Sequence, residues 1–275
     1  MSDYQKKIDF AIKLLRSIPQ DGEICLAYSS GKDSDVILQL ARESNIPFTA
    51  IYSNTTIDPP GTIAHAKENG VKAMNPDKTF FELVRQKGVP SRFYRFCCSA
   101  LKEKYLSERV ILGVRRAESV RRAKRYNEPE ECRVFSKTKK SRQYYPILYW
   151  EDEDVERFIQ DRGIKCHPLY YDEQGNFHVE RRLGCIGCPL GSMKNIRNEF
   201  MKYPKMLKLW IKNAQEYMNN HPDCKTSRKL DGNAYNQMYM RLFCNGNYAN
   251  YQRLTGGGYF PRTKDRLQSL FRRLL

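Results

Sequence analysis

Long apolar runs are missing from this sequence of 275 residues. No stretch approaches the roughly 20 consecutive apolar residues that a membrane-spanning helix needs. The first seven residues, Met-Ser-Asp-Tyr-Gln-Lys-Lys, lack the apolar core of a signal peptide. The sequence also contains no internal repeat and no low-complexity tract. We therefore expect a cytoplasmic protein without a membrane partner.

Acidic residues are scarce relative to basic ones, with 31 Asp and Glu against 48 Lys and Arg and a formal net charge of +17. Such an excess favours polyanionic partners, either nucleic acids or phosphorylated small molecules. Charge alone leaves a generally basic, solvated surface open as the alternative. Hydrophobic residues at 40% and aromatic residues at 12% indicate a folded globular protein.

Short apolar segments alternate with helical patterns over the first 150 residues, and this alternation indicates the fold class. The predicted strands are residues 24–28, 48–52, 71–74, 110–114 and 144–148. Strands that alternate with helices imply an α/β protein with a doubly wound, parallel, five-stranded sheet. We expect residues 1–192 to form a nucleotide-binding domain that includes a cysteine loop. Residues 193–275 are predicted to form a helical, basic C-terminal extension or cap.

A Ser/Gly-rich turn follows the first predicted strand directly, and a helix begins near Asp33. This arrangement directs backbone N–H groups and a helix N-terminus at a phosphate. Gly31 allows close approach of the main chain, and Lys32 supplies a positive charge. An ordinary βα turn, capped by Asp33 or Ser34, is the structural alternative.

The turn lacks the spacing of a Walker A motif. It resembles instead the Ser-Gly-Gly-Lys-Asp-Ser signature of the PP-loop ATP pyrophosphatases, with Ser30 in place of the first Gly. Members of that superfamily hold the pyrophosphate end of ATP, or the matching part of an adenylyl sulfonucleotide, with this loop. The resemblance implies Mg²⁺ beside the phosphates and Asp33 as a Mg²⁺ ligand or a helix cap. The implied nucleotide contacts in this loop are Ser29, Ser30, Gly31, Lys32, Asp33 and Ser34, with Lys32 and Asp33 also catalytic.

Nine cysteines without a secretion signal indicate metal binding, catalysis or buried thiols rather than a disulfide framework. Four of them form two short-spaced pairs, Cys97-Cys98 and Cys185-Ile-Gly-Cys188. Four thiolates match the ligand count of a 4Fe–4S cluster or of a structural zinc site. A redox pair at 185 and 188, or buried thiols at 97 and 98, remain the alternatives.

The other cysteines have no assigned function. Cys25 is expected to be a buried thiol in the first strand. Cys132 and Cys166 would be the substitutes if one of the four proposed ligands is wrong. Cys224 and Cys244 lie in no recognised motif.

Five ordered motifs over residues 24–192 resemble the sulfonucleotide reductases, which act on adenylyl sulfate or its 3′-phospho form. The resemblance implies the adenine nucleotide alpha hydrolase-like fold and a 4Fe–4S cluster, held by the two cysteine pairs beside the nucleotide. It also implies nucleotide contacts from Asn54, Gly113, Arg115 and Arg116, with Arg115 catalytic. The motifs are the Cys97-Cys98 segment, the Gly-Val-Arg of 113–115 with Ser-Val-Arg-Arg-Ala of 119–123, Pro146 to Trp150, His167 to Tyr170, and Gly184 to Pro189.

Two departures from that family bear on the reaction. Asn54-Thr55-Thr56 stands where the family has Asp-Thr-Gly. The C-terminal Glu-Cys-Gly segment, whose thiol attacks the sulfonucleotide, is missing, and no cysteine follows Cys244. Without that nucleophile, reduction through an enzyme thiosulfonate lacks its central residue. We therefore expect a shared fold and a different reaction.

Basic residues cluster after the fourth predicted strand. With interleaved tyrosines they form a combination typical of single-strand binding proteins, so DNA or tRNA is a candidate partner. A solvated face is the alternative. The candidate nucleic-acid contacts are Arg121, Arg122, Lys124, Arg125, Lys139 and Lys140, with Tyr126, Tyr144, Tyr145, Tyr149, Tyr170 and Tyr171 as stacking surfaces.

Together these features predict a PP-loop enzyme that splits ATP and couples adenylylation to sulfur transfer, with a nucleic acid or another acceptor. A sulfur-donor or thiol-reductant protein is then a further candidate partner. The first alternative is a true sulfonucleotide reductase, with a thiol from Cys224, Cys244 or a partner protein. The second is a non-catalytic nucleic-acid-binding subunit with a structural metal site.

Overall fold

The computed structural model describes residues 2–134, 140–244 and 246–255. The chain forms two compact units. Unit 1 comprises residues 1–54, 59–75 and 102–184, and unit 2 comprises residues 55–58, 76–101 and 185–275. Each unit has its own cluster of buried hydrophobic residues. The described part of the predicted C-terminal extension therefore belongs to the same unit as two earlier segments of the chain.

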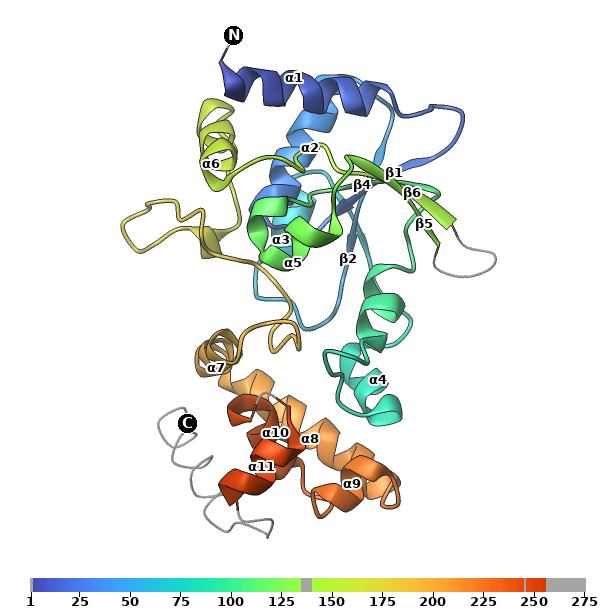
Figure 1. Ribbon diagram of the computed structural model, residues 1–275, viewed down its shortest axis with the longest axis vertical. Helices are drawn as coiled ribbons and strands as arrows, with labels where there is room; N and C mark the ends of the chain where they lie inside the picture. The colour runs from blue at the N-terminus through green and yellow to red at the C-terminus, as the bar shows by residue number, and fades with distance from the viewer. Residues whose placement is uncertain (1, 135–139, 245, 256–275) are drawn as a thin grey trace. The chain divides into compact units, whose positions relative to one another are not determined.

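The strands of unit 1 form one six-stranded sheet in the order β3-β2-β1-β4-β6-β5. Figure 1 labels β1, β2, β4, β5 and β6 of this sheet. The strands are β1 (Ile24–Tyr28), β2 (Thr49–Ser53), β3 (Lys72–Met74), β4 (Arg109–Leu112), β5 (Glu130–Val134) and β6 (Lys140–Tyr144). The helices of unit 1 are α1 (Asp3–Arg16), α2 (Lys32–Ser44), α3 (Thr62–Glu68), α5 (Val120–Arg125) and α6 (Asp152–Asp161), with 3₁₀ turns at Arg116–Glu118 and Pro168–Tyr170.

The central strand β1 pairs in parallel with β2 on one side and with β4 on the other. Leu26 lies opposite Ala50 of β2 and Ile111 of β4, so the register is continuous across three strands. The strand is almost entirely buried, as expected for a parallel strand covered on both faces. The predicted α/β class with a mostly parallel sheet is confirmed.

The prediction of a fifth strand at 144–148 was wrong. The strand is β6, which ends at Tyr144, and the following apolar residues form turns whose side chains are buried. β5 was not predicted; it pairs antiparallel with β6 and makes the sheet six-stranded. Both strands are rich in charged residues and alternate in burial, so an apolar run was the wrong signal for them.

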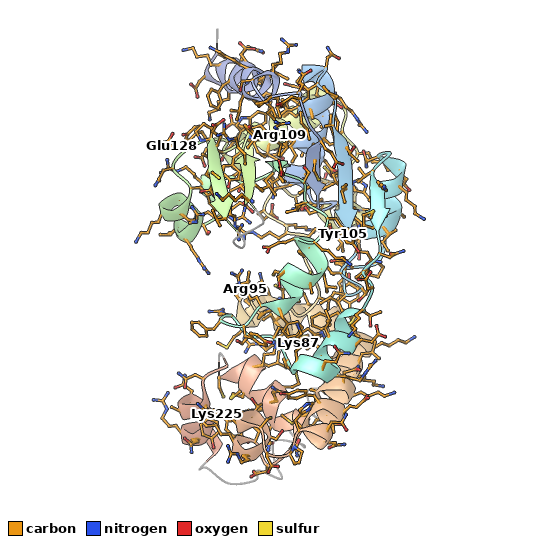
Figure 2. The ribbon with its side chains drawn as sticks, turned by 90° about the vertical axis from the view of Figure 1, so that its right-hand side faces the viewer. Lys87, Arg95, Tyr105, Arg109, Glu128 and Lys225 are labelled. Carbon is orange, nitrogen blue, oxygen red and sulfur yellow. The ribbon has the colours of Figure 1, made fainter. Side chains whose placement is uncertain are left out.

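Ties between loops fix the segments around the sheet. Arg109, at the start of β4, pairs with Asp21 at 2.5 Å, just before β1. The hydroxyl of Tyr105 donates to the carbonyl oxygen of Asn75 at 2.7 Å, just after β3. Arg109 and Tyr105 are both labelled in Figure 2. These two contacts connect the segments that precede β1 and β4 and the segment that follows β3.

The strand order reverses at β1, because β2 and β3 lie on one side of it and β4 on the other. Ligands of such sheets bind at the carboxyl ends of the strands beside this switch point. Gly113 follows β4 there, and a Cβ at this position would lie 3.0 Å from the carbonyl oxygen of Asp33. Glycine therefore lets the end of β4 pack closely against the start of α2 without a tight contact.

Unit 2 is helical. Its elements are α4 (Phe80–Lys87), a π-helical turn at Cys98–Lys102 whose last residue belongs to unit 1, α7 (Met193–Lys202), α8 (Pro204–Asn220), α9 (Lys225–Lys229), α10 (Ala234–Phe243) and α11 (Tyr248–Thr255). Trp210 of α8 is fully buried at the centre of this unit. Its ring centroid lies 4.8 Å from that of Phe80 and 6.1 Å from that of Phe200.

Within the described ranges, no helix has the combination of length and apolar character that crossing a membrane requires.

Two glycines of unit 2 allow a matched test of its packing. Gly88 ends α4 with φ +80° and ψ −176°, and a Cβ there would lie 3.0 Å from Cε1 of Tyr217. Gly232 has φ +60° with no atom within 4 Å of the Cβ position. We predict that Gly88→Ala lowers the free energy of unfolding of unit 2 by about 3 kcal/mol. Gly232→Ala should lower it by about 1 kcal/mol.

The measurement is urea denaturation followed by the fluorescence of Trp210. The sequence has two tryptophans, and Trp150→Phe as the common background removes the one in unit 1. Equal losses for the two alanine variants would contradict the packing described around Gly88.

Candidate functional site

The turn between β1 and α2 has an unusual backbone. Ser30 adopts a left-handed conformation with φ +61°, at the position where the PP-loop signature has glycine. A non-glycine residue there costs roughly 1 kcal/mol. The Ser30 hydroxyl offsets this cost, because it is fully buried and donates to the carbonyl oxygen of Thr62 at 2.9 Å. The Ser30 hydroxyl therefore connects this turn to Thr62 at the start of α3.

The N-cap residue of α2 is Gly31, so no N-cap side chain accepts a hydrogen bond from the first amides of this helix. The predicted alternative, a turn capped by Asp33 or Ser34, does not describe this helix: α2 begins at Lys32. The hydroxyl of Ser34 donates to the carbonyl oxygen of Gly31 at 2.7 Å, and the hydroxyl of Ser29 donates to that of Ser34 at 3.3 Å. Because α2 begins at Lys32, directly after the turn that follows β1, its N-terminus lies at the carboxyl edge of the sheet, where an anion site would form.

Arg115 is the most constrained charged group at this edge. It follows β4, is 1% exposed, and contacts two other segments of unit 1, the start of α2 and residues 150–152. Its Nε donates to Asp33 at 2.6 Å, one terminal nitrogen to Asp152 at 2.7 Å, and the other to the carbonyl oxygen of Trp150 at 3.3 Å. Burial opposes the charged form, but the two carboxylates outweigh it and raise the pKa of Arg115.

Lys32 lies beside this ion pair and is 4% exposed. Its Nζ is 3.5 Å from Oδ2 of Asp33 and 5.7 Å from the ring centroid of Tyr170. The two oxygens of Asp33 are therefore shared between Arg115 and Lys32. The role of Asp33 as a Mg²⁺ ligand stays a prediction.

The remaining predicted nucleotide contacts lie at the ends of neighbouring strands. Asn54 follows β2, and its side-chain amide donates to the Asn75 side chain at 2.9 Å. Gly113 packs on Asp33, and the amide of Arg116 donates to the carbonyl oxygen of Leu148 at 2.9 Å. The structure thus brings residues 29–34, Gly113 and Arg115 together, with Asn54 at the same edge of the sheet.

Behind the loop lies a buried polar network that the sequence did not reveal. Asp35 of α2 is 2% exposed, and it accepts from the Tyr28 hydroxyl and pairs with Nε2 of His65 at 3.0 Å. Burial, reinforced by Asp35, raises the pKa of Tyr28. The network connects β1, α2 and α3 beneath the turn. Asp35 ends the polar run of residues 29–35 at the start of α2, so no sequence signal distinguished it from the residues of the loop.

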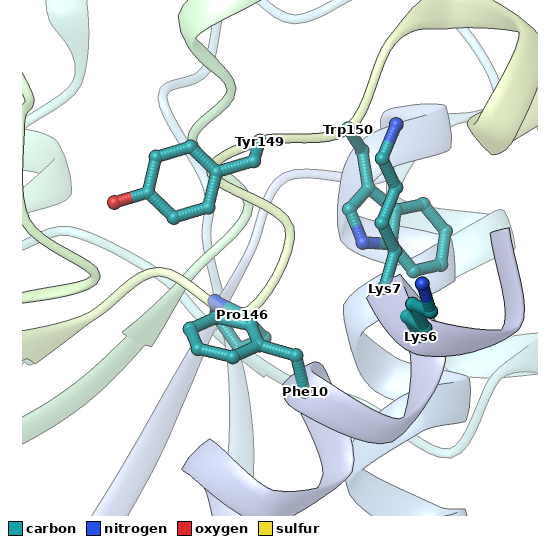
Figure 3. Close-up of a pocket in the computed structure, with 6 residues that line it drawn as sticks. All are labelled: Lys6, Lys7, Phe10, Pro146, Tyr149 and Trp150. Atoms are coloured by element: carbon teal, nitrogen blue, oxygen red, sulfur yellow. The ribbon is translucent and has the colours of Figure 1, made fainter. Parts of the chain in front are cut away.

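Two clefts lie on unit 1 away from the turn itself. One, of about 290 Å³, is polar and lies between α2, α3 and the loop after α6; it is lined by Asp35, Gln39, Arg42, His65, Glu68, Asn69, Arg162, Gly163, Ile164 and Lys165. The other, of about 130 Å³, is lined by Lys6, Lys7, Phe10, Pro146, Tyr149 and Trp150 (Figure 3). Neither includes a predicted nucleotide contact.

The basic segment is partly neutralised by acids. Arg122 pairs with Glu118, and Arg125 makes a two-pronged pair with Glu131 at 2.8 and 3.0 Å. The other predicted contacts that can be placed, Arg121, Lys124 and Lys140, are exposed, and Lys139 lies outside the described residues. The role of these residues in nucleic-acid binding stays a prediction.

Several tyrosines proposed as stacking surfaces are not available for stacking. Tyr144, Tyr145 and Tyr170 are 3% exposed or less, because they fill the interior of unit 1. Tyr149 is 42% exposed, and its hydroxyl donates to the carbonyl oxygen of Asn127 at 3.0 Å. The tyrosine pattern therefore reflects packing at three of its positions.

The four paired cysteines all lie in unit 2 and are partly buried. Cys97 hydrogen-bonds Cys98 and is close enough to Cys185 and Cys188 for their charges to act on it. The bond to Cys98, burial and the neighbouring thiols together raise the pKa of Cys97. Cys185 donates to the hydroxyl of Thr55 at 3.4 Å. Two distant segments of the sequence thus bring their thiols into one neighbourhood.

The Cys185–Cys188 turn is held by residues that the sequence did not single out. Gly187 has φ +76°, and its amide donates to Glu199 at 2.8 Å. Arg241 of α10 donates to the carbonyl oxygens of Gly187 and of Pro90, the latter at 2.8 Å, and stacks on Trp210 at 4.6 Å. The partners come from α7, α8 and α10, so the turn is shaped by the helices that follow it.

In the part of the chain that the structure describes, no group of three or more His, Cys, Asp or Glu side chains is arranged so that it could hold a metal ion. The four thiols are nevertheless donors of the kind that bind iron–sulfur clusters and zinc, and Cys97 lies near the other three.

The remaining cysteines differ in environment. Cys25 is fully buried in β1, in agreement with its prediction. Cys132 is exposed and Cys166 is buried, both in unit 1. Cys224 precedes α9 in unit 2; burial opposes its thiolate, but hydrogen bonds led by that from Ser227 outweigh burial and lower its pKa. Cys244 is 2% exposed, and burial raises its pKa.

Comparisons with known proteins identify relatives of this chain. The chain is 26% identical over 213 residues to an uncharacterized protein of Methanocaldococcus jannaschii, covering 72% of this chain and 42% of that protein. It is 27% identical over 192 residues to sulfate adenylyltransferase subunit 2 of Rhizobium etli, covering 57% of this chain and 59% of that subunit. The chain spans less than half the length of the first curated relatives it matches.

Among solved structures, a phosphoadenylyl-sulfate reductase from Candida auris matches with a TM-score of 0.45 and 14% identity, covering 67% of this chain and 96% of that one. An FMN adenylyltransferase from Candida glabrata matches with the same TM-score and 16% identity, covering 67% of this chain and 62% of that one. A family model, the phosphoadenosine phosphosulfate reductase domain, matches residues 23–191, which is more than half of the chain. The span includes the turn after β1, Arg115 and both cysteine pairs, and the chain belongs to this family.

Proposed function

We propose that this protein is a nucleotide-dependent transferase that cleaves ATP between its α- and β-phosphates and couples adenylylation to sulfur transfer. One observation carries the proposal: at the switch point of the sheet, the N-terminus of α2 lies beside Lys32 and the Arg115–Asp33 pair. The amides and the Lys32 ammonium suit a pyrophosphate group. Arg115 pairs with Asp33 in the first turn of α2, and the positive charge of Arg115 would lie next to the phosphates.

The reaction proposed is a substitution at the α-phosphorus of ATP. A nucleophilic atom of the acceptor forms a bond to that phosphorus, and the bond to the oxygen that bridges the α- and β-phosphates breaks. Pyrophosphate leaves with the electron pair, and the acceptor carries the adenylyl group. Residues 29–34 would hold the leaving pyrophosphate, and Mg²⁺ would neutralise the developing charge.

The four paired cysteines are proposed to hold a 4Fe–4S cluster, with zinc as the alternative metal. Their number, their gathering in unit 2 and the glycine turn at 187 support this assignment. A bound cluster would supply a site for sulfur or for electrons. Cys97, Cys98, Cys185 and Cys188 would each contribute one thiolate, and Arg241 and Glu199 would keep the second pair in its turn.

The acceptor proposed is a nucleic acid, DNA or tRNA. The net charge of +17 supports a polyanionic partner. Arg121, Lys124 and Lys140 are exposed in unit 1 and would contact phosphates. A sulfur-donor protein would then attack the activated atom of the acceptor through a persulfide sulfur, AMP would leave with the bonding electron pair, and a thiol reductant would cleave the resulting S–S bond.

A sulfonucleotide reductase remains the second candidate, and one observation favours it. The thiol of Cys224 has a lowered pKa and is only partly buried, so it is the better internal nucleophile of the two C-terminal cysteines. Cys244 is buried and has a raised pKa, which makes it a poor one.

We predict that Lys32→Ala reduces release of pyrophosphate from ATP by about 100-fold or more. The substitution removes the positive charge of Lys32, which would stabilise the leaving pyrophosphate. Lys72→Ala, which removes an exposed lysine of β3, should leave the rate within about twofold. The measurement is a coupled pyrophosphate assay with nucleic acid present. Release that persists in Lys32→Ala would refute the assigned loop, and no release by the wild-type protein would favour a non-catalytic binding subunit.

A second prediction concerns the metal. Protein purified without oxygen should be brown and contain about four irons and four sulfides per chain. Cys97→Ser and Cys188→Ser should lose most of the iron. Cys132→Ser, at an exposed thiol of unit 1, should keep it. A colourless protein that contains zinc would exclude the cluster.

A third prediction separates the two candidate reactions. With adenylyl sulfate or its 3′-phospho form and a thiol reductant, the wild-type protein should release no sulfite above background. Cys224→Ser and Cys244→Ser should leave pyrophosphate release from ATP within about twofold. Sulfite production that disappears in Cys224→Ser alone would establish the reductase and overturn the transferase.

A further inference from the structure

Tyr170 covers the start of α2. It ends the 3₁₀ turn Pro168–Tyr170 and is 3% exposed. Its ring centroid lies 5.7 Å from Nζ of Lys32, and its hydroxyl lies 3.3 Å from the Cβ position of Gly31. This hydroxyl interacts with the backbone of Lys32 and, to a smaller extent, with that of Leu183. One side chain therefore contacts both the ammonium group and the amide of Lys32.

The position of Tyr170 is fixed by its own segment. The amide of Tyr170 donates to the carbonyl oxygen of His167 at 2.9 Å, and its carbonyl oxygen accepts from the amide of His178 at 2.8 Å. Arg181 donates to the carbonyl oxygen of Tyr171 at 2.6 Å. The Tyr170 ring lies 5.9 Å from that of Phe177. The segment from His167 to Arg181 thus holds the Tyr170 hydroxyl against residues 29–34.

The groups that Tyr170 engages are those that a phosphate needs. The amide of Lys32 is the first of the helix, and first-turn amides have no acceptor within their own helix. A phosphate oxygen and a tyrosine hydroxyl oxygen both accept from such an amide. The ammonium group of Lys32 faces the tyrosine ring as it would face an anion, through attraction to the ring's negative face. The tyrosine therefore takes up two donors of the phosphate cradle.

We propose that the Tyr170 hydroxyl occupies the position of a phosphate oxygen at the N-terminus of α2, and that a nucleotide must displace it to bind. Tyr170 is then a specificity-determining residue: only a ligand with an anionic oxygen that bonds the amide better than a hydroxyl can enter. This inference rests on the proposed nucleotide site. It adds to that site a residue from outside the residues 29–34.

The test is Tyr170→Phe, which removes the hydroxyl and keeps the ring over Lys32. ATP affinity is measured by calorimetry on the full chain, with Mg²⁺ present. Without the competing hydroxyl, Tyr170→Phe should bind ATP about 3- to 10-fold more tightly, which is the effect of about one hydrogen bond. Tyr171→Phe is the matched control, because its hydroxyl accepts from the amide of Cys166 at 3.2 Å. Its affinity should stay within twofold of wild type.

A second measurement reports on the hydrogen bond itself. Without ligand, the amide of Lys32 should exchange its hydrogen about 3- to 10-fold faster in Tyr170→Phe than in wild type or Tyr171→Phe. ATP should slow the exchange in all three proteins, because a phosphate oxygen then accepts from that amide. A role limited to packing would leave the exchange of this amide unchanged.

The outcomes separate this inference from the proposed function. Weaker ATP binding by Tyr170→Phe, or binding equal to that of Tyr171→Phe, overturns the competition while the nucleotide site stands. Absence of ATP binding in wild type and in both variants overturns the nucleotide site and the inference together. Binding that appears only in Tyr170→Phe supports both.

Discussion

The candidate nucleotide site of unit 1 depends on one buried cation. Arg115 is 1% exposed, and a guanidinium without water must be compensated by opposite charge and by hydrogen bonds. Asp33, Asp152 and the carbonyl oxygen of Trp150 provide that compensation. In doing so they connect α2, the end of β4 and the start of α6. Loss of the guanidinium would leave Asp33, in the first turn of α2, with Lys32 at 3.5 Å as its remaining cationic neighbour, and it would break the contact between α2 and the start of α6.

The sequence predicted those parts of the site that are local in the chain. The strand, turn and helix around residues 29–34, and Gly113 after β4, have short-range signals: an apolar run, serines with glycine, and a helical period. Asp152 lies 37 residues from Arg115, and Tyr170 lies more than 130 residues from Lys32. Nothing in their immediate neighbours marks them as partners. β5 and β6 escaped prediction because their stability comes from pairing across the sheet edge rather than from apolar composition.

The cysteine pairs show the same limit in unit 2. Their spacing drew attention to four thiols, and the structure places these in one unit, with Cys97 close to the other three. The support of the second pair was hidden, because Glu199 and Arg241 act on the backbone of Gly187 and not on the sulfur atoms. A carbonyl or an amide has no sequence signature of its own. Predictions of metal sites from ligand spacing therefore omit the residues that give the ligand turn its shape.

The support from α7, α8 and α10 has a consequence for how the protein can be divided. The family match ends at residue 191, whereas the second cysteine pair is packed by residues from 199 to 241. A fragment cut at the end of the family match would keep the cysteines and lose the hydrophobic cluster around Trp210. An expression boundary that keeps the cysteine turn intact must therefore also include the helices α7, α8 and α10.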